Sequence, residues 1–76
     1  MLSSRLNQTR KSRKITAQQM ADSLSMRSYR NYESGDRSPS LDILVKIADI
    51  LSVPTDYLLG RDEYLESLGV SVDEFL

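Results

Sequence analysis

Apolar residues recur along the chain at the spacing of short amphipathic helices. Met20 and Leu24 fall at i and i+4, and Tyr29 and Tyr32 follow at i and i+3. This spacing predicts two short helices joined by a tight turn within residues 16–40. Isolated helices this short are only marginally stable in water, so they must share a hydrophobic core with the rest of the chain.

The strongest apolar stripe follows directly and predicts a fourth helix with Ser40 as its N-cap. This helix is expected to make the largest contribution to the core. Its predicted core face comprises Leu41, Leu44, Val45, Ile47, Ala48 and Leu51.

The helix preceding the tight turn is expected to start at a capping box. Thr16 is a favourable N-cap, and Gln19, three residues later, can bond back to its backbone. An earlier helix is predicted over about residues 2–12, where Leu2 and Leu6 set a helical period. The free N–H groups at the N-terminus of the second helix could also receive a phosphate.

The helix after the tight turn is predicted to run from residue 27 or 28 to Ser34, with Gly35 ending it. Its tyrosines should face the core, which leaves polar side chains outside. Arginine pairs with guanine and asparagine with adenine in the major groove, so such a face can read bases, although solvated surface residues would give the same pattern. The outward residues are Arg27, Ser28, Arg30 and Asn31.

Charge divides the chain into two halves at Ser40. Residues 1–40 hold eight basic and three acidic side chains, a net charge of +5, whereas residues 41–76 hold two basic and eight acidic ones, a net charge of −6. One half is therefore attracted to a polyanion and the other is repelled by it. The alternative is an ordinary solvated surface of mixed charge.

The composition argues against catalysis. The chain has no cysteine and no histidine, which removes disulfides, thiolate metal sites and the commonest general base. An enzyme is not expected, and neither a metal nor a cofactor is predicted. The N-terminus lacks an apolar signal core, and no apolar run approaches membrane-spanning length, so a soluble, cytoplasmic protein without membrane contact is expected.

The spacing of these residues resembles the phage-repressor (Cro/repressor-type, xenobiotic-response-element) helix-turn-helix family. The resemblance implies an all-α fold, in which residues 1–60 form a compact five-helix DNA-binding domain and residues 61–76 an acidic, amphipathic helical extension. The matching positions are Leu6, Arg10, Ile15, Thr16, Met20, Ala21, Leu24, Tyr29, Tyr32, Glu33, Gly35, Pro39, Ser40, Leu41, Leu44, Lys46, Ile47, Ala48 and Leu51.

The resemblance also implies a function. The chain would be a sequence-specific transcriptional regulator of bacterial or phage origin, a repressor that binds double-stranded DNA as a homodimer on a palindromic operator. No small-molecule effector is evident. Arg27, Ser28, Arg30 and Asn31 would contact bases, and Arg10 and Glu33 would form a structural ion pair. The expected phosphate contacts are Arg13, Thr16, Gln18, Ser34, Arg37 and Ser38.

Two departures from the family pattern weaken the expectation of base reading. The segment between Leu24 and Tyr32 is two residues shorter than usual, and Ala17 replaces the family's glutamine at the start of the second helix. The alternative function is therefore a protein-interaction module, antitoxin-like or antirepressor-binding, with weakened base readout.

An apolar patch for dimerisation is predicted on the fourth helix and a short fifth helix. The alternative is that these residues widen the buried stripe. The predicted patch comprises Ile43, Ile50, Val53, Pro54, Tyr57 and Leu58. The extension over residues 61–76 could cover this patch on its own monomer, exchange onto a partner, or lead into an effector region.

Overall fold

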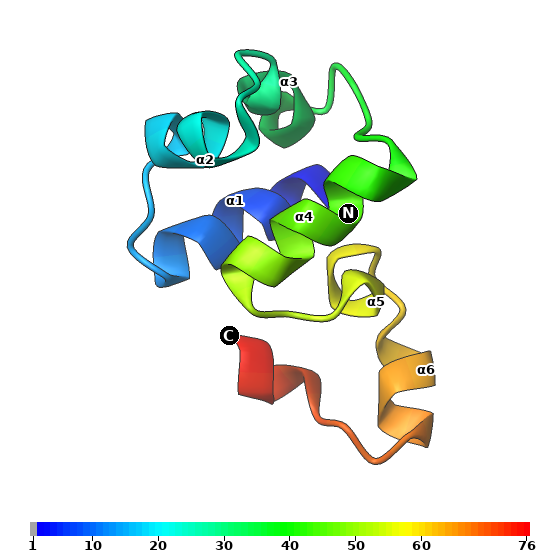
Figure 1. The fold of residues 1–76 in the computed structure, drawn as a ribbon. Helices are drawn as coiled ribbons and strands as arrows, with labels where there is room; N and C mark the ends of the chain where they lie inside the picture. The colour runs from blue at the N-terminus through cyan, green and yellow to red at the C-terminus, as the bar shows by residue number, and fades with distance from the viewer. Residues whose placement is uncertain (1) are drawn as a thin grey trace.

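The computed structural model describes residues 2–76, all of whose regular elements are helical, and the predicted all-α class is confirmed. Helices α2 and α3 lie at one end of the molecule and α6 and η1 at the opposite end, with α1, α4 and α5 between them (Figure 1). The elements are α1 (Leu2–Ser12), α2 (Ala17–Leu24), α3 (Tyr29–Ser34), α4 (Leu41–Leu51), α5 (Thr55–Leu58), α6 (Asp62–Ser67) and the 3₁₀ helix η1 (Val72–Phe75).

The helix ends follow the local chemistry of the sequence. Thr16 caps α2 through a complete capping box with Gln19, and the Ser40 hydroxyl accepts from the Ile43 N–H at the start of α4, as predicted. Gly35 ends α3 at φ +85°, in the left-handed region that glycine adopts without strain. These caps define where the short helices begin and end.

Helix α3 starts at Tyr29, slightly later than predicted, because Arg27 and Ser28 lie in the turn. Ser25 ends α2 in the left-handed conformation, with φ +53°. Residues 25–28 form the turn between α2 and α3, which leaves only six residues for α3.

The buried stripe of α4 is narrower than predicted. Leu44 and Leu51 are buried, but Leu41 and Val45 remain 80% and 50% exposed, so their assignment to the core is wrong. Ile43, on the other flank of the stripe, is half-buried and packs against the core. The helical period correctly predicted the middle of the buried face of α4. Which residues at the edges of this face are buried depends on where the neighbouring helices pack.

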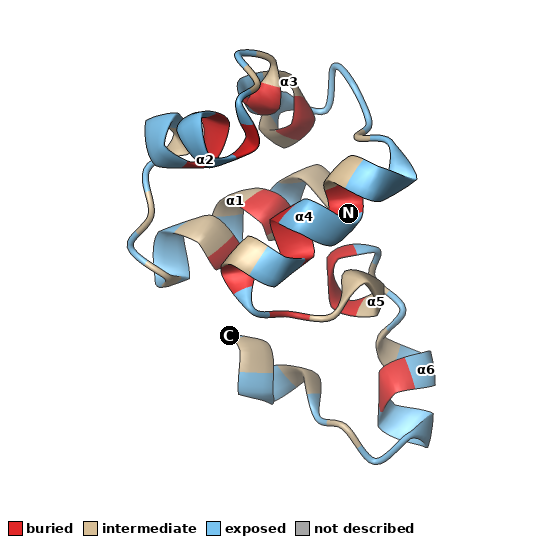
Figure 2. Ribbon diagram, viewed as in Figure 1, coloured by how far each residue is buried: buried red, intermediate tan, exposed pale blue. Residues whose placement is uncertain are grey.

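The predicted dimer patch is also wrong in part, because half of its residues belong to the monomer core. Val53, Tyr57 and Leu58 are 7%, 3% and 0% exposed, respectively. Helix α5 turns back onto α1, and the Phe75 ring lies 5.2 Å from that of Tyr57. Ile43, Ile50 and Pro54 are half-buried. The six residues therefore do not form one exposed apolar surface (Figure 2).

The C-terminal extension, residues 61–76, packs on its own monomer. The Arg5 guanidinium donates to both Asp62 carboxylate oxygens, at 2.6 and 2.7 Å, and to the Tyr57 carbonyl at 2.8 Å. At the other end of the extension, Arg13 donates to the carbonyls of Leu51 (3.1 Å) and Phe75 (3.3 Å). Arg5 of α1 and Arg13, which directly follows α1, thus hold the extension in place.

We expect the Arg5→Ala variant to loosen α6 while leaving α2 and α3 unchanged. The substitution removes a bidentate ion pair and leaves Leu65 as the main buried anchor of α6. Hydrogen exchange should therefore accelerate at the amides of α6. Arg37→Ala is the control, because Arg37 is exposed in the loop after α3 and has no ion pair within residues 2–76. Equal acceleration throughout the chain would contradict a local role for Arg5.

Candidate nucleic-acid interface

The turn between α2 and α3 is closed by backbone hydrogen bonds. The Met26 N–H donates to the Ala21 carbonyl at 2.9 Å, and the Ser25 N–H donates to the carbonyls of Ala21 and Asp22. The rings of Tyr29 and Tyr32 meet edge to face beneath α3, with centroids 6.2 Å apart. Both tyrosines are buried, so the opposite side of α3 must face outward.

The four residues predicted to read bases divide between the turn and α3, with Arg27 and Ser28 in the turn and Arg30 and Asn31 in the helix. Arg27 and Arg30 are exposed, whereas Ser28 and Asn31 are half-buried. Within α3, Asn31 and Ser34 are three residues apart and lie on one face. The predicted base-contact residues are therefore close together in the chain, but they do not share one helical face.

An ion pair anchors the outward helix to α1. Arg10 Nε and Glu33 Oε2 are 2.6 Å apart, and the side chains are only 12% and 10% exposed. Asn7 donates to Glu33 Oε1 at 2.8 Å, and Arg10 also donates to the Ile15 carbonyl at 2.8 Å. The Arg10–Glu33 pair predicted from the sequence is thus present and extended by two further hydrogen bonds.

This network alters the protonation of Glu33. Burial alone would raise the pKa of the Glu33 carboxyl, but hydrogen bonds, chiefly from Arg10, outweigh burial and hold this pKa below its usual range. Burial also raises the pKa of Tyr29, whose hydroxyl has no hydrogen-bond partner among the described residues. The carboxylate therefore stays charged and keeps Arg10 in place.

The predicted phosphate contacts divide into free and occupied groups. Arg37 and Ser38 are exposed in the loop after α3. Gln18 donates to Asp22 at 2.9 Å, and the Ser34 hydroxyl donates to the Asn31 carbonyl at 3.1 Å. The side chains of Gln18 and Ser34 are thus already used within the chain.

Thr16 and Arg13 also differ in their surroundings. The Thr16 hydroxyl is used in the cap of α2, where it accepts from the Gln19 N–H. The Arg13 guanidinium, predicted to contact a phosphate, already donates to the Leu51 and Phe75 carbonyls. The C-terminal extension, whose position could not be read from the local sequence, supplies one of these acceptors.

The cations therefore fall into two groups with different roles. Arg5, Arg10, Arg13 and Arg61 are all bound within the molecule. Among residues 2–76, the basic side chains outside any ion pair or hydrogen bond are Lys11, Lys14, Arg27, Arg30, Arg37 and Lys46. Five of these six belong to the basic N-terminal half, which contains α2 and α3.

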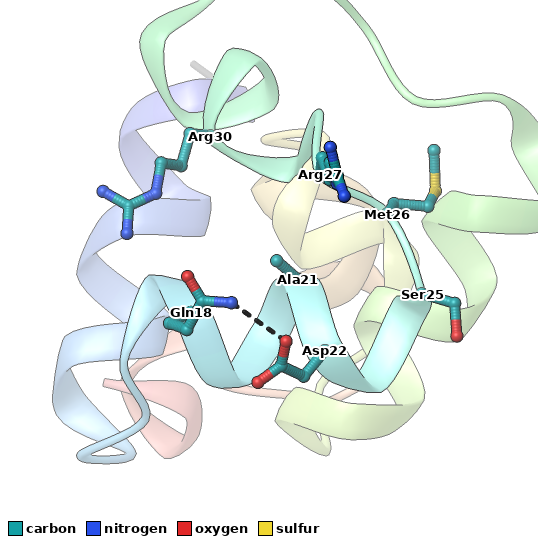
Figure 3. A pocket seen from close by; sticks show the side chains of 7 residues that line it. All are labelled: Gln18, Ala21, Asp22, Ser25, Met26, Arg27 and Arg30. Carbon is teal, nitrogen blue, oxygen red and sulfur yellow. Dashed lines mark hydrogen bonds between the residues drawn. The ribbon is translucent and has the colours of Figure 1, made fainter.

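Two open grooves contain most of the free cations. One, of about 480 Å³, runs between α2 and α3 and is lined by Arg27, Arg30 and Asp22 (Figure 3). The other, of about 510 Å³, is lined by Arg30, Lys11 and Lys14. Lys11 and Lys14 were not among the phosphate contacts predicted from the sequence. Their place in the chain shortly before the start of α2 could have indicated them.

Two short helices joined by a tight turn, with an outward face of free cations and amides, define a helix-turn-helix domain. The chain belongs to the helix-turn-helix family, whose model matches residues 6–58. No solved structure matches the chain significantly.

Curated relatives support this membership. The chain is 48% identical over 59 residues to the cryptic phage CTXphi transcriptional repressor RstR of Vibrio cholerae, covering 75% of this chain and 53% of the relative. It is 38% identical over 64 residues to the HTH-type transcriptional regulator ImmR of Bacillus subtilis, covering 82% and 50%. The chain thus spans about half the length of these relatives.

The described residues contain neither a membrane-spanning helix nor a cluster of potential metal ligands. Within residues 2–76, every helix is too short or too polar to cross a bilayer. The same part of the chain contains no cluster of three or more histidine, cysteine, aspartate or glutamate residues suited to a metal ion.

Proposed function

We propose that this chain is a sequence-specific DNA-binding transcriptional regulator, acting as a dimeric repressor on a palindromic operator. The observation that carries the proposal is the groove between α2 and α3, which is lined by the unpaired Arg27 of the turn and the unpaired Arg30 of α3, the helix that also carries Asn31. Arginine and asparagine have the donors and acceptors that distinguish guanine and adenine in the major groove. The names of the relatives support regulation of transcription.

The proposed mechanism places α3 of each subunit in a major groove. Two such helices would occupy successive grooves about 34 Å apart, so a two-fold dimer would match a palindromic site. A dimer bound over a promoter would exclude RNA polymerase. The acidic half, residues 41–76, would face away from the phosphates, which explains how a chain of net charge −1 could bind DNA.

A second function is favoured by the shortness of α3. Because α3 has six residues and Arg27 lies in the preceding turn, base reading could be lost, leaving a protein-interaction module. A gel shift on random DNA and on the promoter of the chain's own gene, across salt concentrations, separates the two functions. Tighter binding to the promoter supports the regulator, whereas equal or absent binding favours the interaction module.

We expect the Arg37→Ala variant to weaken binding to all DNA sequences alike. Arg37 is exposed in the loop after α3 and has no ion pair within residues 2–76. If it neutralises one phosphate per subunit, the salt dependence of log K should become shallower by about 2 for a dimer. A lost operator preference with an unchanged salt dependence would instead identify Arg37 as a base reader.

A further inference from the structure

The four residues predicted to read bases do not occupy equivalent positions on α3. Asn31 and Ser34 are three residues apart on one face of α3, and Arg27 lies in the turn that leads into the helix. Arg30 lies within α3, next to Asn31 in the chain and three residues after Arg27. Figure 3 shows the Arg30 side chain extending away from Arg27.

Arg30 is also the residue that lines both grooves. In the α2–α3 groove it shares the lining with Arg27 and with the carboxylate of Asp22. In the second groove it meets Lys11 and Lys14, and the lining contains no acidic residue. Arg10 also lines this second groove, but its guanidinium is already paired with Glu33. We name the second groove the basic groove.

The basic groove has the charge of a phosphate-binding surface. Lys11, Lys14 and Arg30 are exposed, and no carboxylate among residues 2–76 lies in an ion pair with any of them. Bringing three cations to one groove is unfavourable unless an anion or salt screens them. The α2–α3 groove is less suitable, because Asp22 would repel a phosphate there.

We propose that Arg30 binds the DNA backbone, and not a base, together with Lys11 and Lys14 in the basic groove. Arg27 and Asn31 then remain to read bases. This inference rests on the proposed DNA-binding function and specifies which side chains of the same surface contact the phosphates. It assigns the basic groove to a phosphodiester segment beside the major groove entered by α3.

The test compares the Arg30→Ala and Arg27→Ala variants on promoter and random duplexes across salt concentrations. Arg30→Ala should weaken binding to both duplexes by the same factor and make the log K against log salt slope shallower by about 0.9 per subunit. Arg27→Ala should reduce the promoter-to-random affinity ratio by about 5-fold or more. Lys46→Ala is the control for loss of a free cation on α4, outside both grooves, and should leave the slope unchanged.

The Arg30→Lys variant provides a second and sharper comparison. A phosphate accepts an ammonium as a point charge, so Arg30→Lys should retain the parent slope and ratio. A pair with guanine made through the planar fork of the guanidinium would be weakened by the lysine, and the promoter-to-random ratio would then fall. A lower promoter-to-random ratio in both Arg30 variants, with an unchanged slope, would overturn the inference while leaving DNA binding intact. Absence of binding by the parent chain to either duplex at low salt would overturn the proposed function itself.

Discussion

Replacing Glu33 with Gln is expected to lower the free energy of unfolding by about 3 kcal/mol, because it leaves the Arg10 charge largely buried without its partner. The two side chains are only 12% and 10% exposed, and their closest atoms are 2.6 Å apart. Urea unfolding monitored by circular dichroism measures the change. Since this pair joins α1 to α3, the loss should be larger than for a surface substitution.

Asp56→Asn is the matched control for the Glu33 variant. Asp56 pairs with Arg61 at 2.9 Å, but the Arg61 side chain is 54% exposed, so the control should cost less than about 1 kcal/mol. Equal unfolding midpoints for the Glu33→Gln variant and the parent would show that the Arg10–Glu33 pair contributes no stability in solution.

The stability difference between the parent and Glu33→Gln should depend on pH. The Glu33 pKa is lowered in the folded state, so its contribution is fully present above the unfolded-state pKa of about 4.3. The contribution should disappear as the pH falls through the folded-state pKa. Unfolding measured from pH 7 down to pH 3 should show the difference shrinking below about pH 4.3. A difference that stays constant with pH would exclude ionised Glu33 as its source.

The double variant Arg27→Ala, Asn31→Ala is expected to lose about 2 to 6 kcal/mol of specific DNA binding, or about 1 to 3 kcal/mol for each substitution. Neither side chain belongs to the buried core, so the fold should persist. Gel shifts on the promoter duplex measure the loss, and circular dichroism verifies the helical content. The physical reason is the removal of two base-edge contacts, one from the turn before α3 and one from α3 itself.

Ser23→Ala, on the exposed surface of α2, is a suitable control for the double variant. It lies outside both grooves and should bind the promoter as the parent does. If the double variant also bound the promoter as tightly as the parent, the recognition surface would have to lie elsewhere on the molecule.

Local sequence patterns predicted most of the helical framework because the signals act over a few residues. The Thr16–Gln19 capping box, the Ser40 cap and the left-handed Gly35 each depend on adjacent backbone groups. The buried tyrosines, Tyr29 and Tyr32, were likewise predicted from helical spacing. The same spacing placed the polar side of α3 outward.

The candidate interface was predicted less completely, because free and bound cations look alike in a sequence. Arg13 and Arg37 both sit in the basic half, yet Arg13 is held by the carbonyls of Leu51 and Phe75 whereas Arg37 is exposed. The nearest of these acceptors lies 38 residues from Arg13 in the chain. Such a pairing depends on how distant segments meet, which local chemistry does not specify.

Sequence patterns alone predicted the helix-turn-helix class, the caps and the separation of charge between the two halves of the chain. The burial of Tyr57 by α5 and the extension, and the exposure of Leu41 and Val45, became known from the packing of the helices. This packing also placed Arg30 beside Lys11 and Lys14 in the basic groove. The physical reason is that caps and periodicity arise from neighbouring residues, whereas burial and ion pairing depend on which helix faces meet when the chain folds.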